Sequence, residues 1–222
     1  MPLNFSSVIP QDKERVISSF DFIDIAKQRA VVTFYAGHYM DAGINKFTLS
    51  NVIFTSEKTN IRASTTISNF TQVHDNSHEA RIDVPITIQG DVIMNVPLAV
   101  DSDDANNANA CISSGLFISG STIRLLGNVS SGIIASAGTA EEEIKTCMKF
   151  TIPTTKIKAG EYLRWRISTF GRKDTAGNCF IWYGHDPAGT ATHGTANEFN
   201  FGGTRTYNTS RASILIPIKI DI

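Results

Sequence analysis

The sequence predicts an all-β protein, folded as an antiparallel, jelly-roll-like β-sandwich with long polar loops and an extended N-terminal arm. Its 222 residues include 27 Ile, 11 Val and 22 Thr but only 8 Leu, and β-branched side chains favour strands. Short apolar runs with period two recur along the chain, separated by polar turns about 8 to 12 residues apart. No stretch has a convincing helical period, so parallel α/β folds are excluded.

The chain is expected to divide into an arm, residues 1–19, and one domain, residues 20–222. The arm is polar and has no periodic pattern, which is typical of a segment that orders only against a partner. Five apolar side chains interrupt it and are the predicted partner contacts: Phe5, Val8, Ile9, Val16 and Ile17.

The first half of the domain is expected to hold six short strands. They lie at 20–25, 31–35, 47–54, 61–67, 81–88 and 91–100. Gly90 predicts a hairpin turn between the last two, and Pro85 and Pro97 are expected at a strand edge, end or bulge. The segment FTQVHDNSHEARID (70–83) predicts a polar loop, because Asp75, Asn76 and Ser77 favour turns and no apolar helical face is present.

The second half carries the clearest alternation. Short strands are expected at 116–118, 122–126 and 132–134, and residues 139–145 are read as a turn. In 143–152 and 160–170 one parity is apolar, with Leu163, Trp165 and Ile167 predicted to face the core. Residues 179–184 (CFIWYG) are apolar on both parities, as in a central strand, and the terminal isoleucines at 214, 216, 218, 220 and 222 predict a core strand. Long polar loops are expected at 101–110, 171–178 and 184–212.

Charge and cysteine usage exclude several functions. With 20 basic and 21 acidic residues, the net charge is −1, so binding to nucleic acid or to an anionic membrane is not expected. The N-terminus lacks a signal-peptide pattern, which predicts synthesis in a cytoplasm without export. Cys111, Cys147 and Cys179 are odd in number and far apart, so we expect reduced, buried or half-buried thiols.

One oxygen-rich loop is a candidate cation site. Asp101, Asp103 and Asp104 could hold Ca²⁺, although the loop departs from the EF-hand pattern, and a solvated loop is the simpler interpretation. No other cofactor is indicated.

The segment YGHDPAGTATHG (183–194) is the second candidate site. His185 and Asp186 could bind a metal together with His193, or act in acid/base chemistry, but Asp186 before Pro187 is equally typical of a turn. Tyr183 and its aromatic neighbours could stack on a sugar, although Trp165 shares a face with core residues. Neither a nucleophile elbow nor a suitably spaced carboxylate pair occurs, so the sequence predicts a protein that is not an enzyme.

Four stretches together resemble a group of uncharacterised virion proteins of tailed bacteriophages. They are FDFIDIAKQRAVVTFYAG (20–37), GEYLRWRIS (160–168), HDP (185–187) and LIPIKIDI (215–222). The resemblance covers both ends of the chain and consists of strand patterns. It implies a structural role on a phage particle, as a capsid decoration (cement) protein or a minor head or tail component, with the major capsid protein or other virion proteins as partners.

Three functional hypotheses follow from these observations. The first is a non-enzymatic virion protein that forms a homo-oligomer, expected to be a trimer, and attaches through its arm. The second is a glycan-binding host-attachment module that uses Tyr183, His185 and Asp186, with Ca²⁺ held by the loop beginning at Asp101. The third, metal-dependent chemistry at His185 and His193, is the least favoured.

Overall fold

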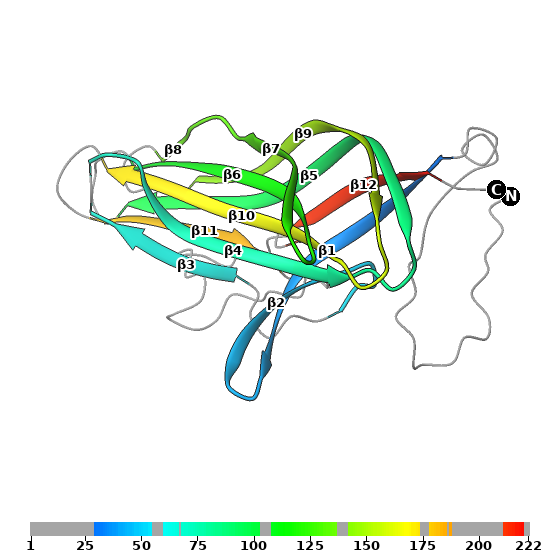
Figure 1. Cartoon of the computed structure of the whole chain (residues 1–222). Helices are drawn as coiled ribbons and strands as arrows, with labels where there is room; N and C mark the ends of the chain where they lie inside the picture. Colours follow the sequence, from blue (N-terminus) through cyan, green and yellow to red (C-terminus); the bar gives the residue numbers. More distant parts are fainter. Residues whose placement is uncertain are drawn as a thin grey trace, which may run out of the picture.

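The computed structural model describes residues 29–54, 60–66, 68–102, 108–136, 142–173, 178–185, 187 and 211–219, and all regular structure in these ranges is β (Figure 1). The strands are β1 (Arg29–Asp41), β2 (Ile44–Ser50), β3 (Asn60–Thr65), β4 (Thr71–Arg81), β5 (Ile86–Ser102), β6 (Ala108–Ser119), β7 (Ile123–Ser130), β8 (Ile134–Ser136), β9 (Glu142–Ile157), β10 (Tyr162–Lys173), β11 (Cys179–Gly184) and β12 (Ser213–Lys219). The all-β prediction is confirmed. No helix able to span a membrane occurs in these ranges.

The strand pairs are nested along the chain. β1 pairs with β12, β4 with β10, β5 with β9 and β6 with β7, all antiparallel, as in one long hairpin folded back on itself. Further pairs, β12 with β5 and β10 with β6, join these into two sets, β1-β12-β5-β9 and β4-β10-β6-β7. One parallel residue pair, Thr48 with Glu79, connects the sets through β2 and β4, so the twelve strands form a single mixed sheet that is not closed.

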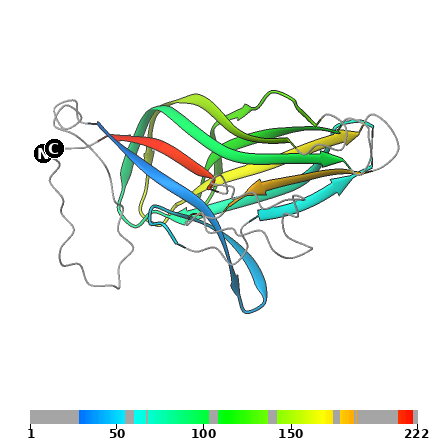
Figure 2. The same cartoon turned by 180° about the vertical axis from the view of Figure 1, so that it is seen from behind.

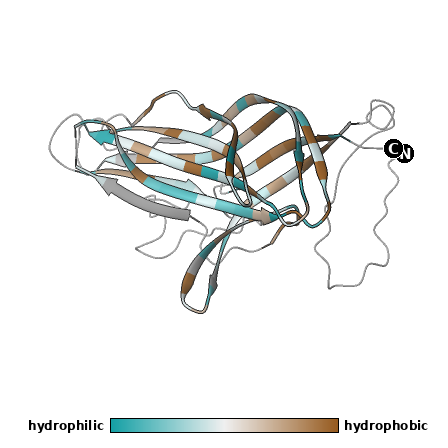
Figure 3. Ribbon diagram, in the orientation of Figure 1, coloured by the Kyte–Doolittle hydropathy of each residue, from teal (hydrophilic) through white to brown (hydrophobic). Residues whose placement is uncertain are grey.

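The two sets face each other across one apolar core (Figures 1 and 2). Hydropathy alternates along several strands, as expected when one face is buried and the other meets water (Figure 3). Leu163, Trp165 and Ile167 are buried, as predicted, and so are Ile214 and Ile216. The Trp165 indole N–H donates to Ser114 Oγ at 2.6 Å, and that hydroxyl lies 3.1 Å from Met94 Sδ on the opposite set.

The predicted hairpin at Gly90 is wrong. β5 continues through Gly90 to Ser102, and the pairing with β9 shifts register there. Gly90 has φ +120°, and a side-chain carbon at this position would lie 3.3 Å from Pro217 Cγ, so a glycine is needed at this close approach. Pro97 lies inside β5, at the gap where pairing with β12 ends at Asn95 and pairing with β11 begins at Leu98.

The predicted polar loop at 70–83 is also wrong for most of its length, because Thr71–Arg81 forms β4. Its charged side chains pair with β10, where Glu79 contacts Arg164 and Asp75 contacts Arg166. Several expected bounds shift as well. β1 is a single strand from Arg29, β9 already begins at Glu142, and β10 continues to Lys173.

The three cysteines are free, and two follow the prediction. Cys179 is buried and Cys111 is half-buried, but Cys147 is exposed on β9. Of the predicted segments, the arm 1–19, residues 20–28, most of the 184–212 loop, Ile220 and Ile222 lie outside the described residues.

The Trp165–Ser114 contact can be tested by substitution. We expect Trp165→Phe to lower the free energy of unfolding by about 2 kcal/mol, because ring volume is lost and Ser114 loses its donor. Urea denaturation measures the change. Tyr162→Phe, at a half-exposed position on the same strand, is the control and should change stability by less than about 0.5 kcal/mol. Equal effects of the two variants would contradict a central role for Trp165.

Candidate functional site

Buried histidines and aromatic rings form a cluster where β1 and β2 leave the body of the protein. We define the histidine cluster as His38 (β1), Phe47 (β2), His74 and His78 (β4), Trp165 (β10), Tyr183 (β11) and His185, which follows β11. The cluster therefore joins five strands that come from both halves of the sheet.

Phe47 lies at the centre of this cluster. Its ring centroid is 5.4 Å from that of His38, 5.3 Å from His78 and 6.2 Å from His185. The His38 and His185 rings are 5.9 Å apart, and those of His78 and His185 are 6.2 Å apart. Most of these rings meet edge to face, which is a favourable packing geometry for aromatic groups.

Tyr183 extends the cluster toward β4. Its ring lies 5.5 Å from His74, 5.6 Å from His185 and 6.4 Å from His78. His74 Nε2 lies 3.3 Å from the carbonyl oxygen of Ile181, so this hydrogen bond requires a proton on Nε2. All four histidines and Tyr183 are buried.

Burial keeps His74, His78 and Tyr183 uncharged at neutral pH. It lowers the pKa of His78 to about 3, with the charge on His38 acting in the same direction and the nearby Trp165 backbone opposing it. Burial also lowers the pKa of His74, against a raising effect of the Ile181 carbonyl, and raises the pKa of Tyr183. These side chains therefore act as neutral packing groups near pH 7, where a general acid or base would need a pKa close to the operating pH.

The structure places the predicted site residues as follows. Tyr183 and His185 come together in the histidine cluster, but both are fully buried, so neither presents a ring face on which a sugar could stack. Asp101 lies in β5, and its side chain is not among those described. Asp103, Asp104, Asp186, His193 and the arm residues Phe5, Val8, Ile9, Val16 and Ile17 lie outside the described residues.

Sequence reasoning missed His38, Phe47, His74 and His78 as members of one cluster. A usable signal exists in 71–81, where the charged residues Asp75, Glu79 and Arg81 share one parity and both histidines share the other. That alternation is typical of a strand with one buried face. In the described part of the chain, no three His, Cys, Asp or Glu side chains are grouped as metal ligands.

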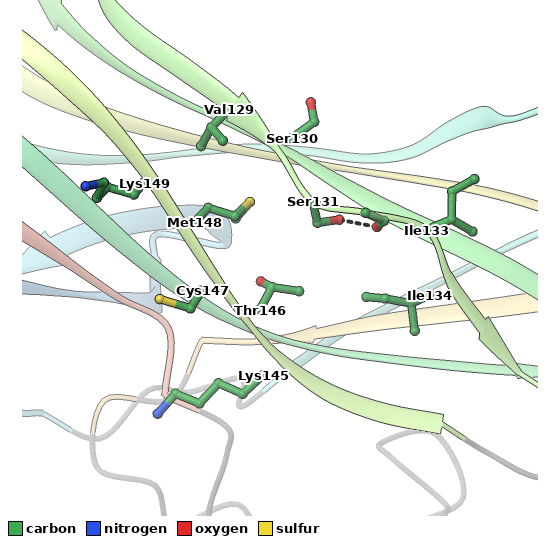
Figure 4. A pocket seen from close by; sticks show the side chains of 11 residues that line it. Val129, Ser130, Ser131, Ile133, Ile134, Lys145, Thr146, Cys147, Met148 and Lys149 are labelled. Atoms are coloured by element: carbon green, nitrogen blue, oxygen red, sulfur yellow. Dashed lines mark hydrogen bonds between the residues drawn. The ribbon is translucent and has the colours of Figure 1, made fainter.

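A second feature is a groove between the edges of the two halves of the sheet. A hollow of about 440 Å³ lies between residues 129–134, which run from the end of β7 to the start of β8, and residues 145–149 of β9 (Figure 4). Thr146 and Met148 are buried and point toward this connection, whereas Lys145, Cys147 and Lys149 are exposed and point away from it. Next to the groove along β9, the Phe150 ring packs on Gly127 of β7.

The histidine cluster should make stability depend on pH. The folded-state pKa of His78 is about 3, whereas an unfolded histidine titrates near 6.5. The unfolded state therefore gains protons first, and stability falls as the pH drops below about 6.5. Between pH 7 and pH 5 we expect His78 alone to cost about 2 kcal/mol.

The measurement compares urea unfolding of the wild type and His78→Phe at pH 7 and pH 5. For each protein, the free energy of unfolding at pH 5 is subtracted from that at pH 7. A loss of stability that the variant shows at both pH values therefore cancels. Ser121→His, at an exposed turn, is the control and should leave the wild-type difference unchanged. An identical pH difference in His78→Phe and the wild type would contradict the assignment.

Comparisons with known proteins show no family for this chain. No family model matches it, and no curated protein matches it. Similar solved structures include a CocE/NonD family hydrolase from Staphylococcus aureus, with 10% identity and a TM-score of 0.44 over 86% of this chain and 37% of the hydrolase. An aminopeptidase from a marine sediment archaeon, Thaumarchaeota archaeon, has 6% identity and a TM-score of 0.49 over 85% of this chain and 37% of its own.

The structure of the infectious bursal disease virus Gx strain is also similar, with 10% identity and a TM-score of 0.24 over 97% of this chain and 59% of that chain. This chain spans little more than a third of the hydrolase and the aminopeptidase. With TM-scores below 0.5, these likenesses carry no inference about the activity or partners of this protein.

Proposed function

We propose that this protein is a non-enzymatic structural component of a tailed-phage virion, of the capsid decoration or minor head type. Copies associate as a homo-oligomer, expected to be a trimer with closed symmetry, and bind the major capsid protein or another virion protein. The work of such a protein is done by surface buried between chains rather than by a pocket.

The nested strand order supports a jelly roll as the finer description of the fold. In a jelly roll, a long antiparallel hairpin of eight strands rolls up into two four-stranded sheets. The eight strands here are β1, β4, β5, β6, β7, β9, β10 and β12, with β2, β3, β8 and β11 as additions. Folds of this kind serve in viral capsids as well as in lectins, so the fold is compatible with the proposal and does not by itself select it.

The observation that carries the proposal is the projecting hairpin of β1 and β2 (Figures 1 and 2). Its base is held by His38 and Phe47 of the histidine cluster, whereas the outer part carries Tyr39 (44% exposed) and Ile44 (59% exposed). Ala42 and Gly43 form its two-residue turn, both with positive φ. A two-stranded ribbon alone is marginally stable in water, and exposed apolar groups on it indicate a surface that another chain covers.

Association is tested by placing a charge on the hairpin. We expect the full chain to sediment as an oligomer and Ile44→Asp to weaken association by about tenfold or more, because the charge would be desolvated in the contact. Val84→Asp is the matched control, since Val84 is 70% exposed on the turn before β5, away from the hairpin. A wild-type chain that stays monomeric at all concentrations would overturn the oligomer.

Location on a particle is tested separately. Antibodies against the purified protein should label intact particles of the encoding virus at regular positions in electron micrographs, and mass spectrometry of purified particles should recover the chain. Its absence from purified particles, together with its presence in infected cells, would overturn the virion assignment.

A further inference from the structure

We propose that the hairpin of β1 and β2 of one copy lies on an apolar patch on the outer face of β6, β7 and β10 of the next copy. We define this patch as Phe117 (β6), Ile123 and Leu125 (β7) and Tyr162 (β10). The inference rests on the proposed homo-oligomer and names the surface that receives the hairpin.

The strand register brings the four side chains of the patch together. Tyr162 pairs with Ser119 and Ser119 with Ile123, and Phe117 pairs with Leu125 in the next row. Directly opposed residues point to the same face of a sheet. Ile123 is 64% exposed, Leu125 55% and Tyr162 40%, and Phe117 is half-buried. Three of the ten exposed large apolar side chains of the described residues therefore gather on one face, which is typical of an interaction surface.

Gly115 makes the patch flat. A side-chain carbon at this position would lie 2.9 Å from Phe117 Cε2, so the Phe117 ring leans along β6 over the glycine. The ring therefore presents a broad apolar surface close to the plane of the sheet. Flat sheet faces accept a second β layer at about 10 Å.

The outer part of the hairpin has one face that suits this surface. Tyr39 pairs with Lys46 and Asp41 with Ile44, so these four exposed side chains point to the same side of the ribbon. The two apolar groups occupy one diagonal of this face, and the acid and the base occupy the other. Neither Asp41 nor Lys46 forms an ion pair with another residue in the part of the chain that the structure describes.

The border of the patch offers charges of both signs. Arg164 of β10 pairs in register with Phe117 on one side and with Glu79 of β4 on the other. The Arg164 and Glu79 side chains contact each other and remain 29% and 35% exposed. Partly exposed ion pairs contribute little by themselves, so their members can take a second partner. An acid and a base beside the patch can thus face Lys46 and Asp41 of an incoming hairpin.

The hairpin and the patch lie at separate places on one chain. In the order of the sheet, β4, β10 and β6 lie between β2 and β7, and the hairpin projects away from the body (Figures 1 and 2). A contact between the two surfaces therefore joins two copies. A closed ring of three requires a contact of this heterologous kind, because the twofold contact of a surface with itself closes at two copies.

The same contact covers the exposed apolar groups of both surfaces. A twofold contact between two patches would leave Tyr39 and Ile44 of the hairpin exposed, and a twofold contact between two hairpins would leave the patch exposed. The hairpin of a second copy is therefore the occupant that accounts for both.

Cross-linking of mixed variants tests the contact in the full chain. Ile44→Cys and Leu125→Cys are made separately, each with Cys147→Ser to remove the exposed native thiol. The two proteins are mixed and allowed to exchange subunits before a short bismaleimide is added. We expect at least about fivefold more linked dimer in the mixture than in either protein alone, because only the mixture brings a hairpin thiol close to a patch thiol.

Ile133→Cys is the matched control for Leu125→Cys. Ile133 is 61% exposed but lies between β7 and β8, outside the patch. Mixed with Ile44→Cys, it should give no more product than the single proteins. Equal yields with Ile133→Cys and Leu125→Cys would overturn the inference. A yield from Leu125→Cys alone that equals the yield of the mixture would indicate a twofold contact between patches and would also overturn it.

A charge exchange tests the same contact by affinity. We expect Ile44→Asp and Leu125→Lys each to weaken association by about tenfold, because each places a charge in an apolar contact. Combined in one chain, they should recover at least about threefold of this loss, since the two charges would meet as a pair. Ile133→Lys should not rescue Ile44→Asp. Losses that simply multiply in the double variant would contradict the contact.

Failure of this inference is distinguishable from failure of the proposed function. If the chain sediments as an oligomer that Ile44→Asp weakens, but the mixed thiols do not link, the hairpin contacts another surface and only the inference is wrong. A wild-type chain that is monomeric at all concentrations would overturn both the oligomer and the inference. Absence from purified particles, with the cross-link intact, would overturn the virion assignment alone.

Discussion

The architecture depends on the pairing of β5 along both of its edges. Over 17 residues this strand pairs with β9 on one side and, on the other, first with β12 and then with β11. Pro97 stands at the change of partner, where fewer ladder hydrogen bonds are required of it. The position of β12, and through it that of β1 and the hairpin, therefore follows from the register of β5.

The histidine cluster gives the hairpin a buried polar base, in which burial lowers the pKa values of His74 and His78. Rings from β1, β2, β4, β10 and β11 meet there, so the projecting element is anchored to both halves of the sheet. Among the described residues, only Thr48 and Glu79 join these halves by backbone pairing. Imidazole rings pack like small aromatic groups while they remain neutral, but once protonated each would be a costly buried cation. We therefore expect the packing at the base of the hairpin to be stable at neutral pH and to be destabilised in acid.

Much of the fold could be predicted from side-chain parity, and most failures have a physical cause. Parity located the buried faces of β10 and β12 correctly because Trp165 lies between two arginines and because isoleucine recurs at every second position of β12. It failed for β4, since histidine counts as polar in sequence yet His78 is buried. It also failed at Gly90, where the partner that requires glycine, Pro217, is distant in the chain. Burial of Tyr183 and His185 depends on strands that the local sequence does not reveal.

The pairing of β1 with β12 has a mechanical consequence. Arg29 and Lys219 are partners, so the described chain enters and leaves the sheet at adjacent points on two antiparallel strands. A force pulling these two points apart would open the hydrogen bonds one pair after another, as in a zipper, and would meet little resistance. A force that pulls β5 and β9 past each other along their length would instead load many hydrogen bonds of their ladder at once. The protein should therefore resist a force that shears β5 against β9 better than a force that separates Arg29 from Lys219.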